Sequence, residues 1–260
     1  MPVKELGFTS LKLTKPLNSN DMKHPMIILL SAFLLGACAQ DNVLSSKEKK
    51  QGFQLLFDGK TPSAWRGAYQ KNFPSKGWLI QDGALFGDLK EGGEAADGGD
   101  LVSIKTYKNF DFRFDWKLGA LGNSGVKYFV QEALPKGSPG SQPGYEYQLI
   151  DDADFIYNGE HLPNEIKTGA LYQLAAPNKP DVDLRRWHHS RIVVQGDDIQ
   201  HYLDGKLVVS IHRKSSAFLE AFKKSKFHVL PDYPYLKEGH LLLQDHGHKV
   251  AFKNLKIREL

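Results

Sequence analysis

Aromatic and charged residues alternate without interruption in the segment Phe110–Trp116, which reads F-D-F-R-F-D-W. A β-strand turns successive side chains to opposite faces, so this segment would place its aromatic rings on one face and its charges on the other. An α-helix of the same sequence would spread the rings around its whole circumference. The segment therefore predicts a strand that packs one face on a core and turns the other to water.

Turn signals cut the chain after Phe53 into further short strands. Asp-Gly pairs stand at 58–59, 82–83 and 204–205, and such pairs favour two-residue hairpin turns. The expected strands, by residue number, are 53–57, 78–81, 84–87, 110–116, 126–131, 145–150, 170–174, 191–195, 199–203, 207–211, 241–244 and 250–257. Strands at this density predict an all-β fold, a single two-sheet β-sandwich or jelly roll over residues 53–260.

One short helix and two long loops complete the expected domain. Residues 215–226 carry Phe218 and Phe222 at helical spacing, with a serine available as the N-cap. Residues 90–99 and 134–144 have no hydrophobic period and are rich in glycine or proline, so they are expected to be loops. Long loops of a sandwich usually border its binding face.

The single cysteine, Cys38, follows a segment typical of export. Lys23 precedes an apolar run at 25–35, which is too short to span a bilayer, and small residues come next. The sequence L-G-A-C at 35–38 resembles the bacterial lipobox, in which the cysteine carries lipid and becomes the new N-terminus. The alternative is a buried hydrophobic helix with an inert cysteine.

The lipobox interpretation divides the chain into four parts. Residues 1–21 would be an upstream extension, 22–37 a signal peptide, 38–52 a polar tether and 53–260 the folded body. The expected location is then the bacterial cell envelope, at the outer membrane and facing either the periplasm or the surface. The lipid would be the only contact with the membrane.

Charge and cysteine content exclude some classes of function. The chain has 34 basic and 30 acidic residues, and it has no basic tract with interleaved aromatic residues, so nucleic acid is not expected as a partner. One cysteine allows neither an internal disulfide nor a zinc site built from thiolates. The histidines at 188, 189, 240, 246 and 248 have no spacing diagnostic of zinc.

Glu146 and Gln148 are the sharpest candidates for a functional site. In the strand expected at 145–150 they share one face with Ile150, about 6.6–6.8 Å apart, while the tyrosines of the strand turn to the other face. A carboxylate beside an amide can hold vicinal hydroxyls or place a base next to a reactive carbon. The alternative is a solvated outer face without a function.

Lys127 and His246 are candidates for charge stabilisation and proton transfer. Lys127 follows the expected turn 123–125, where a cation could stabilise an oxyanion or could simply lie on the surface. His246 lies two residues beyond Gln244 and shares its face, at a strand end where an imidazole can transfer protons near neutral pH. These groups and the glutamate strand are expected to converge on one concave face.

Two further groups have both a functional and an ordinary interpretation. The acidic run 151–154 could bind a hard cation through its oxygens or could form a wet loop. Tyr128, Tyr172 and Trp187 could stack on sugar rings or could belong to the core. A divalent metal ion is therefore possible, and no other cofactor is expected.

Seven short motifs follow one another along residues 52–260. They are F-D-G-K at 57–60 with Trp65, N-S-G-V at 123–126, E-Y-Q-L-I-D-D at 146–152, G-A-L-Y at 169–172, H-Y-L-D-G at 201–205, L-Q-D-H-G at 243–247 and F-K-N-L at 252–255. In order and spacing they resemble the 3-keto-disaccharide hydrolase family, whose fold is a concanavalin A-like sandwich. The chain departs from the family pattern at His188 and Asp204, where asparagine is common, and at Lys253, where arginine is common.

That resemblance implies cleavage of glycosides already oxidised to a ketone at C3. The ketone acidifies the C2 proton, a base can remove it, and the group at C1 can then leave before water adds. Glu146 or His246 would serve as base and acid, and Lys127 or a divalent ion would polarise the ketone. The residues expected to bind this carbohydrate are Gln148, Asn123, Tyr172, Gln244 and Asp151.

Two other functions stay open on the sequence. A retaining laminarinase-like hydrolase needs two carboxylates about 5–5.5 Å apart. Gln148 and Ile150 share the strand face of Glu146 and are not acidic, so Asp245 or Asp115 would have to supply the second carboxylate. A lectin-like module would bind glycans without turnover, and it needs no polar cluster with shifted pKa values.

Overall fold

The computed structural model describes residues 40–87, 98–132, 142–180 and 182–260. The folded unit extends over Ala39–Leu260. The expected signal peptide at 22–37, the lipidation site Cys38 and most of the two expected long loops lie outside the described residues. In the part of the chain that is described, no helix has the length and apolar character needed to cross a membrane.

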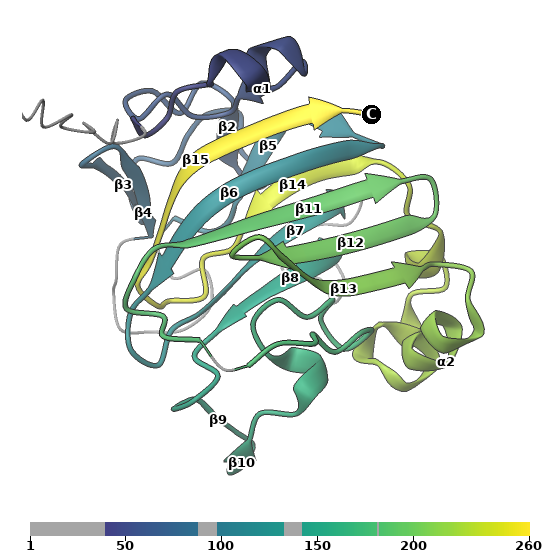
Figure 1. Cartoon of the computed structure of the whole chain (residues 1–260). Coiled ribbons are helices and arrows are strands. Elements are labelled where there is room, and N and C mark those ends of the chain that lie inside the picture. The colour runs from purple at the N-terminus through teal and green to yellow at the C-terminus, as the bar shows by residue number, and fades with distance from the viewer. Residues whose placement is uncertain (1–39, 88–97, 133–141, 181) are drawn as a thin grey trace, which may run out of the picture. The chain divides into compact units, whose positions relative to one another are not determined.

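Two antiparallel sheets form the sandwich (Figure 1). The larger sheet has the order β13-β12-β11-β6-β15-β4-β3, with β1 beside β15, and the smaller sheet has the order β2-β5-β14-β7-β8. The expected all-β two-sheet fold is confirmed. The larger sheet contains β1 (Gln54–Leu55), β3 (Trp78–Gln81), β4 (Ala84–Gly87), β6 (Phe110–Leu118), β11 (His188–Gln195), β12 (Asp198–Leu203), β13 (Lys206–His212) and β15 (Val250–Glu259). The smaller contains β2 (Trp65–Gly67), β5 (Leu101–Tyr107), β7 (Asn123–Val130), β8 (Tyr145–Ile150) and β14 (Gly239–Leu243).

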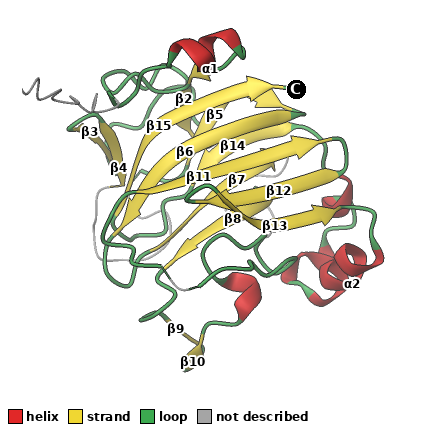
Figure 2. Cartoon of the chain, viewed as in Figure 1, coloured by secondary structure: helices red, strands yellow, loops and turns green. Residues whose placement is uncertain are grey.

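Short helices and one small hairpin surround the two sheets (Figure 2). The expected helix is confirmed as α2 (Ser216–Lys224), where the Ser215 hydroxyl accepts a hydrogen bond from the backbone N–H of Phe218. The side chain of Phe218 is fully buried against the core. The remaining elements are α1 (Ser46–Lys50), the hairpin of β9 (Ile156–Tyr157) and β10 (Glu160–His161), and the 3₁₀ turns η1 (Asn164–Ile166), η2 (Lys226–Val229) and η3 (Tyr233–Tyr235).

The aromatic face of β6 forms the centre of the core. Its four rings are buried, and Phe110 and Phe114 meet Tyr128 and Tyr147 of the smaller sheet edge to face, at centroid distances of 5.9 and 5.5 Å. The alternation expected for this strand is confirmed, because its charged residues lie on the outer face of the larger sheet. Tyr128 is a core residue, so it does not stack on a sugar.

Strand β5 and the segment 170–174 differ from the expected strands. The burial of β5 does not alternate along its sequence, so no period of two marks it. Segment 170–174 is a turn in which the N–H of Leu171 donates to the carbonyl of Ala175 and the N–H of Ala175 donates to that of Leu171. Its apolar residues are buried because they cover the edge of β8, to which backbone hydrogen bonds such as that from the N–H of Tyr172 to the carbonyl of Glu146 at 3.0 Å join it.

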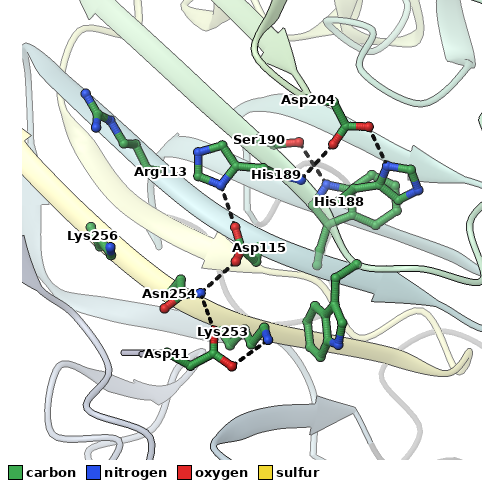
Figure 3. A network of polar contacts seen from close by, with 12 residues as sticks. Asp41, Arg113, Asp115, His188, His189, Ser190, Asp204, Lys253, Asn254 and Lys256 are labelled. Carbon is green, nitrogen blue, oxygen red and sulfur yellow. Dashed lines mark hydrogen bonds and ion pairs between the residues drawn. The ribbon is translucent and has the colours of Figure 1, made fainter. Parts of the chain in front are cut away.

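Residues 41–51 pack against the larger sheet, whereas the sequence analysis assigns them to a polar tether. A capping box closes the start of α1, and Glu48 of this helix binds Lys256 of β15 at 3.1 Å. Asp41 accepts a hydrogen bond of 2.9 Å from Asn254, also on β15 (Figure 3). The polar run contains the S-x-x-E signature of a helix start, so its charges build a docked helix.

Two of the three departures from the family pattern contact each other. The Nδ1 atom of His188 lies 3.0 Å from a carboxylate oxygen of Asp204 (Figure 3). Its Nε2 atom lies 2.8 Å from the carbonyl oxygen of Asp183. These two contacts hold the ring of His188 in place, and the ring stacks on Trp116 at a centroid distance of 4.8 Å.

Candidate active site

A pocket of about 660 Å³ lies on the outer face of the smaller sheet, a volume typical of sites for small ligands. Side chains alternate along β7 and β8, so every second residue faces away from the core and into this pocket. Seven residues singled out in the sequence analysis line it together, namely Asn123, Lys127, Glu146, Gln148, Tyr172, Gln244 and His246. The expected convergence on one concave face is therefore what the structure shows.

Glu146 and Gln148 are buried, with exposed fractions of 6% and 2%. The alternative of a solvated outer face is excluded for both. The chain that follows β8 forms a further wall of the pocket through Phe155, Tyr157 and Tyr172, and this wall shields the sheet from water. A buried carboxylate costs free energy unless other groups compensate it, so the site is a built polar cluster rather than ordinary surface.

A chain of hydrogen bonds fixes the orientation of His246. The Gln148 amide nitrogen donates to the Asn123 carboxamide oxygen at 3.1 Å, and the Asn123 amide nitrogen lies 3.3 Å from Nε2 of His246. Since that amide nitrogen is a donor, Nε2 acts as the acceptor in this contact. The contact fixes the ring of His246 at the pocket, where an imidazole can transfer a proton.

Gly125 lies beneath the side chain of Glu146, between two residues that line the pocket. Gln148 is its register partner on β8, and on the other side the N–H of Gln244 donates to its carbonyl oxygen at 2.9 Å. A Cβ atom at position 125 would collide with the carboxylate of Glu146, whose Cδ would be 3.0 Å away. The Glu146 carboxylate therefore occupies the space that the glycine leaves above the sheet.

Asp100 and Asp245 complete the polar cluster. The sequence analysis proposed neither of them as the base. The carboxylate of Asp100 accepts the backbone N–H of Asp245 at 2.8 Å, and both residues line the pocket. Burial raises the pKa of Asp100 to about 6, Lys127 opposes this rise, and the charges of Asp245 and Glu146 add to it. Lys127 is thus the cation in a cluster of three carboxyl groups.

No sequence signal could have identified Asp100, because it precedes β5, the strand whose pattern does not alternate. Asp245 lies inside the motif L-Q-D-H-G, between the glutamine and the histidine that were selected. The alternation rule turns its side chain away from those two neighbours. The turn after β14 breaks that rule and brings Asp245 to the pocket.

Asp151 lies outside the pocket, although it was expected to bind substrate. One of its carboxylate oxygens accepts the N–H of Leu121 at 3.0 Å, and the other accepts the N–H groups of Ala153 and Asp154 at 3.3 Å. Asp152 binds Lys179 and the N–H of Thr168. Asp151 therefore caps backbone groups, and Asp152 forms an ion pair and accepts a backbone hydrogen bond, so the carboxylates of both residues bind groups of the protein.

Two other residues from the sequence analysis lie on the far side of the sandwich. Trp187 packs under the ammonium group of Lys253, 4.5 Å from its ring centre. Asp115 binds His189 and Asn254 on the outer face of the larger sheet, so it cannot be a second carboxylate beside Glu146 (Figure 3). Within the described ranges, no group of three or more His, Cys, Asp or Glu side chains is arranged to hold a metal ion.

Comparison with known proteins gives consistent matches over the whole folded body. Residues 52–258 match the family model of the 3-keto-alpha-glucoside-1,2-lyase-like domain. A 3-keto-disaccharide hydrolase of Bacteroides thetaiotaomicron is 31% identical over 233 residues, which cover 80% of this chain and 79% of the relative.

Solved structures agree with this assignment. A candidate glycosyl hydrolase from Parabacteroides distasonis is 36% identical, with a TM-score of 0.75 over 85% of this chain and 100% of its own. A second such protein from the same organism is 23% identical, with a TM-score of 0.56 over 75% of this chain and 99% of its own, and it shares the fold. The chain belongs to the family of 3-keto-alpha-glucoside-1,2-lyase-like domains and is a glycoside-cleaving enzyme.

Proposed function

We propose that this enzyme cleaves 3-keto-glucosides and 3-keto-disaccharides by removing the proton at C2 and expelling the group at C1. The observation that carries the proposal is the arrangement of Glu146, Lys127 and His246 around one pocket of a size that suits a sugar. The name of the Bacteroides thetaiotaomicron relative, a 3-keto-disaccharide hydrolase, supports the same substrate class.

Glu146 is the base in this proposal. Its carboxylate lies over Gly125, where a sugar ring resting on the pocket floor would present a ring carbon to it. Removal of the C2 proton leaves an electron pair that is shared with the C3 ketone as an enolate. The ammonium group of Lys127, two residues from Gly125 on the same strand face, stabilises that negative charge.

The C1–O bond then breaks. The enolate electrons form a C1=C2 double bond conjugated with the ketone, and the departing oxygen takes a proton from the imidazole of His246. Water adds to C1 afterwards, and C2 regains a proton, so the net reaction is hydrolysis. Gln148, Asn123, Gln244 and Tyr172 hold the sugar during these steps.

A substrate labelled with deuterium at C2 tests this mechanism. We expect a 3-keto-glucoside carrying C2 deuterium to react more slowly or to lose its label to solvent. Glu146→Gln keeps the size of the side chain and removes the base, so turnover should fall by about 10²–10⁴-fold. Glu160→Gln, a change at an exposed glutamate of the β9–β10 hairpin, is the control and should react like the parent.

Three results would contradict the proposal in different ways. Full activity of Glu146→Gln would remove this residue from the chemistry and transfer the role of base to His246. Cleavage of unoxidised glucosides without exchange at C2 would indicate a laminarinase-like hydrolase, with Asp245 as the second carboxylate in the pocket. Binding of glycans with no turnover of either sugar class would indicate a lectin-like module.

We further propose that the enzyme is held at the bacterial cell envelope by a lipid on Cys38. The support is the sequence, in which a basic residue, an apolar run and L-G-A precede the single cysteine. Cys38→Ala should abolish incorporation of a labelled fatty acid and release the protein from the membrane fraction. Equal labelling of the parent and the variant would contradict the anchor.

A further inference from the structure

Two side chains that line the pocket each carry a buried acceptor oxygen that has no hydrogen-bond donor among the described residues. The carboxamide oxygens of Gln148 and Gln244 are buried and have no hydrogen-bond partner among the described residues. Both side chains line the pocket. A buried polar atom left without its hydrogen bond costs about 1–3 kcal/mol, and folded proteins leave few such atoms. Two of them on one pocket floor therefore mark positions where a ligand supplies the donors.

These two glutamines flank Gly125 from opposite sides. Gln148 on β8 and Gln244, the residue after β14, are its neighbours on either side. Adjacent strands lie about 4.8 Å apart, so the backbones of the two glutamines are separated by roughly 10 Å. Their side chains reach toward a ring that rests between them. The Glu146 carboxylate occupies the middle of this row, above Gly125.

The third polar position is a donor. Lys127 follows Gly125 by two residues on β7, so its ammonium group belongs to the same face of the sheet. A carboxamide oxygen can only accept a hydrogen bond, and an ammonium group can only donate one. The floor thus offers two acceptors and one donor around a central carboxylate.

A glucosyl ring oxidised at C3 carries the complementary pattern. Its ketone oxygen can only accept, and the hydroxyls on C2 and C4, which flank the ketone, can donate. We infer that Gln148 and Gln244 accept hydrogen bonds from these two hydroxyls while Lys127 donates to the ketone oxygen. This inference rests on the proposed function and specifies its substrate class: the reacting ring carries free hydroxyls on both sides of the ketone.

The consequence is a restriction on linkage. A ring that is substituted at C2 or C4 has no donor for one of the glutamines, and its substituent has to enter a buried part of the floor. The enzyme then acts on rings whose only substituent is the group at C1. Within a glycan, such a ring is a terminal residue.

Binding measurements on Glu146→Gln test the inference without turnover. The ligands are methyl 3-keto-α-glucopyranoside and its 2-deoxy, 4-deoxy and 6-deoxy counterparts, and calorimetry gives the affinities. Removal of the C2 or C4 hydroxyl should weaken binding about 3- to 10-fold, the worth of one neutral hydrogen bond. The 6-deoxy ligand is the control for loss of a hydroxyl that the inference does not assign.

Gln148→Met and Gln244→Met, each added to Glu146→Gln, complete a double-mutant cycle. Each methionine variant should bind the parent sugar about 3- to 10-fold more weakly, and it should no longer distinguish the parent from one of the two deoxy ligands. The pairing identifies which glutamine holds which hydroxyl. Gln148→Glu and Gln244→Glu keep an acceptor oxygen, so they should still distinguish the deoxy ligands even if a methionine variant folds poorly.

The inference would be overturned if the effects of the glutamine substitutions and of the missing hydroxyls were independent of each other. If each methionine variant still discriminates against both deoxy ligands as strongly as its parent, the glutamines do not read these hydroxyls. The proposed function would survive that result, because it is tested by turnover and by label exchange at C2. If the methyl 3-keto-glucoside neither binds to Glu146→Gln nor reacts with the unmodified enzyme, the proposed function fails and the inference fails with it.

Discussion

The pocket and the outer face of the larger sheet are both rich in buried polar groups, but they differ in whether those groups have hydrogen-bond partners within the protein. On the outer face, the carboxylate oxygens of Asp115 accept hydrogen bonds from His189 and Asn254, at 2.5 and 2.6 Å (Figure 3). In the pocket, the carboxamide oxygens of Gln148 and Gln244 have no donor among the described residues. One region satisfies its acceptors within the protein and the other leaves acceptors for a ligand.

This difference separates stability from function. A satisfied network lowers the free energy of the folded state through its own contacts. An unsatisfied acceptor raises that free energy, and only a bound ligand recovers the cost. Substitutions on the outer face should therefore change stability with little effect on turnover, whereas substitutions in the pocket should do the reverse.

Removal of the Asp111 charge should give the largest effect on stability. This fully buried carboxylate accepts hydrogen bonds from Arg191 at 2.7 and 2.9 Å, and Arg113 and Arg258 lie within 3.4 Å. Asp111→Asn should lower the free energy of unfolding by about 3 kcal/mol, because three guanidinium groups then lose their counter-charge. Urea unfolding measures the loss, and the turnover of the remaining folded protein should match that of the parent.

The same carboxylate makes the parent sensitive to acid. Burial alone would raise the pKa of Asp111, but hydrogen bonds from Arg191 and Arg113 hold it below its usual value. Its stabilising effect is therefore fully present above the unfolded pKa of about 3.9 and is lost as the pH falls through the lower pKa of the folded state. A loss of turnover in Asp111→Asn at full folding would break the separation between the two regions.

Gly125→Ala should give the largest effect on turnover among changes that leave every charged group in place. The added methyl collides with the end of the Glu146 side chain, which can move, so the fold should survive with a small loss of stability. A displaced base should lower kcat/KM by about 10²-fold. Gly119→Ala is the matched control, because its methyl meets the side chain of Lys249 outside the active-site pocket. Equal activity of the two variants would contradict the placement of Glu146.

Asp100→Asn should stabilise the protein, because the pocket disfavours the ionised form of this carboxyl group. Burial raises the pKa of Asp100 to about 6, above its unfolded value of about 3.9. The protonated form favours folding, and this contribution is lost as the pH rises through 6. Asparagine keeps the acceptor for the Asp245 N–H and cannot ionise.

The stability of the Asp100→Asn variant should therefore equal that of the parent near pH 4. Well above pH 6 the variant should be more stable, by up to about 3 kcal/mol. Urea unfolding at pH 4 and pH 7 provides the measurement. A variant that is less stable than the parent at pH 7 would show that the ionised carboxylate is compensated in the pocket, as its counterparts on the outer face are.

The sequence predicted those features that follow from side-chain alternation. The rings of Phe110–Trp116 define a core face, and the same period places Glu146 beside Gln148 on the opposite face of another strand. The gathering of Asn123, Lys127 and His246 around them was inferred from motifs and not from geometry. Alternation is a property of a single strand, so it predicts which side chains share a face of the sheet. It does not predict the loops that cover that face.

The errors share a physical cause, which is that local sequence does not reveal distant partners. Asp151 was predicted to bind substrate, but its carboxylate oxygens accept hydrogen bonds from backbone N–H groups of nearby turns. The polar segment before residue 52 looked like a tether until β15 supplied the charges that hold it. Asp100 carried no signal, because its role depends on burial beside Lys127 and Glu146.

The path of the chain into the folded body sets which way the enzyme faces. Asp41 and Glu48 are bound on the outer face of the larger sheet, by Asn254 and Lys256, while the pocket opens on the outer face of the smaller sheet. Anything attached upstream, including the lipid proposed at Cys38, is therefore joined to the back of the enzyme. If the proposed lipid is present, substrate would reach the pocket from the face opposite to the one on which the chain enters the folded body.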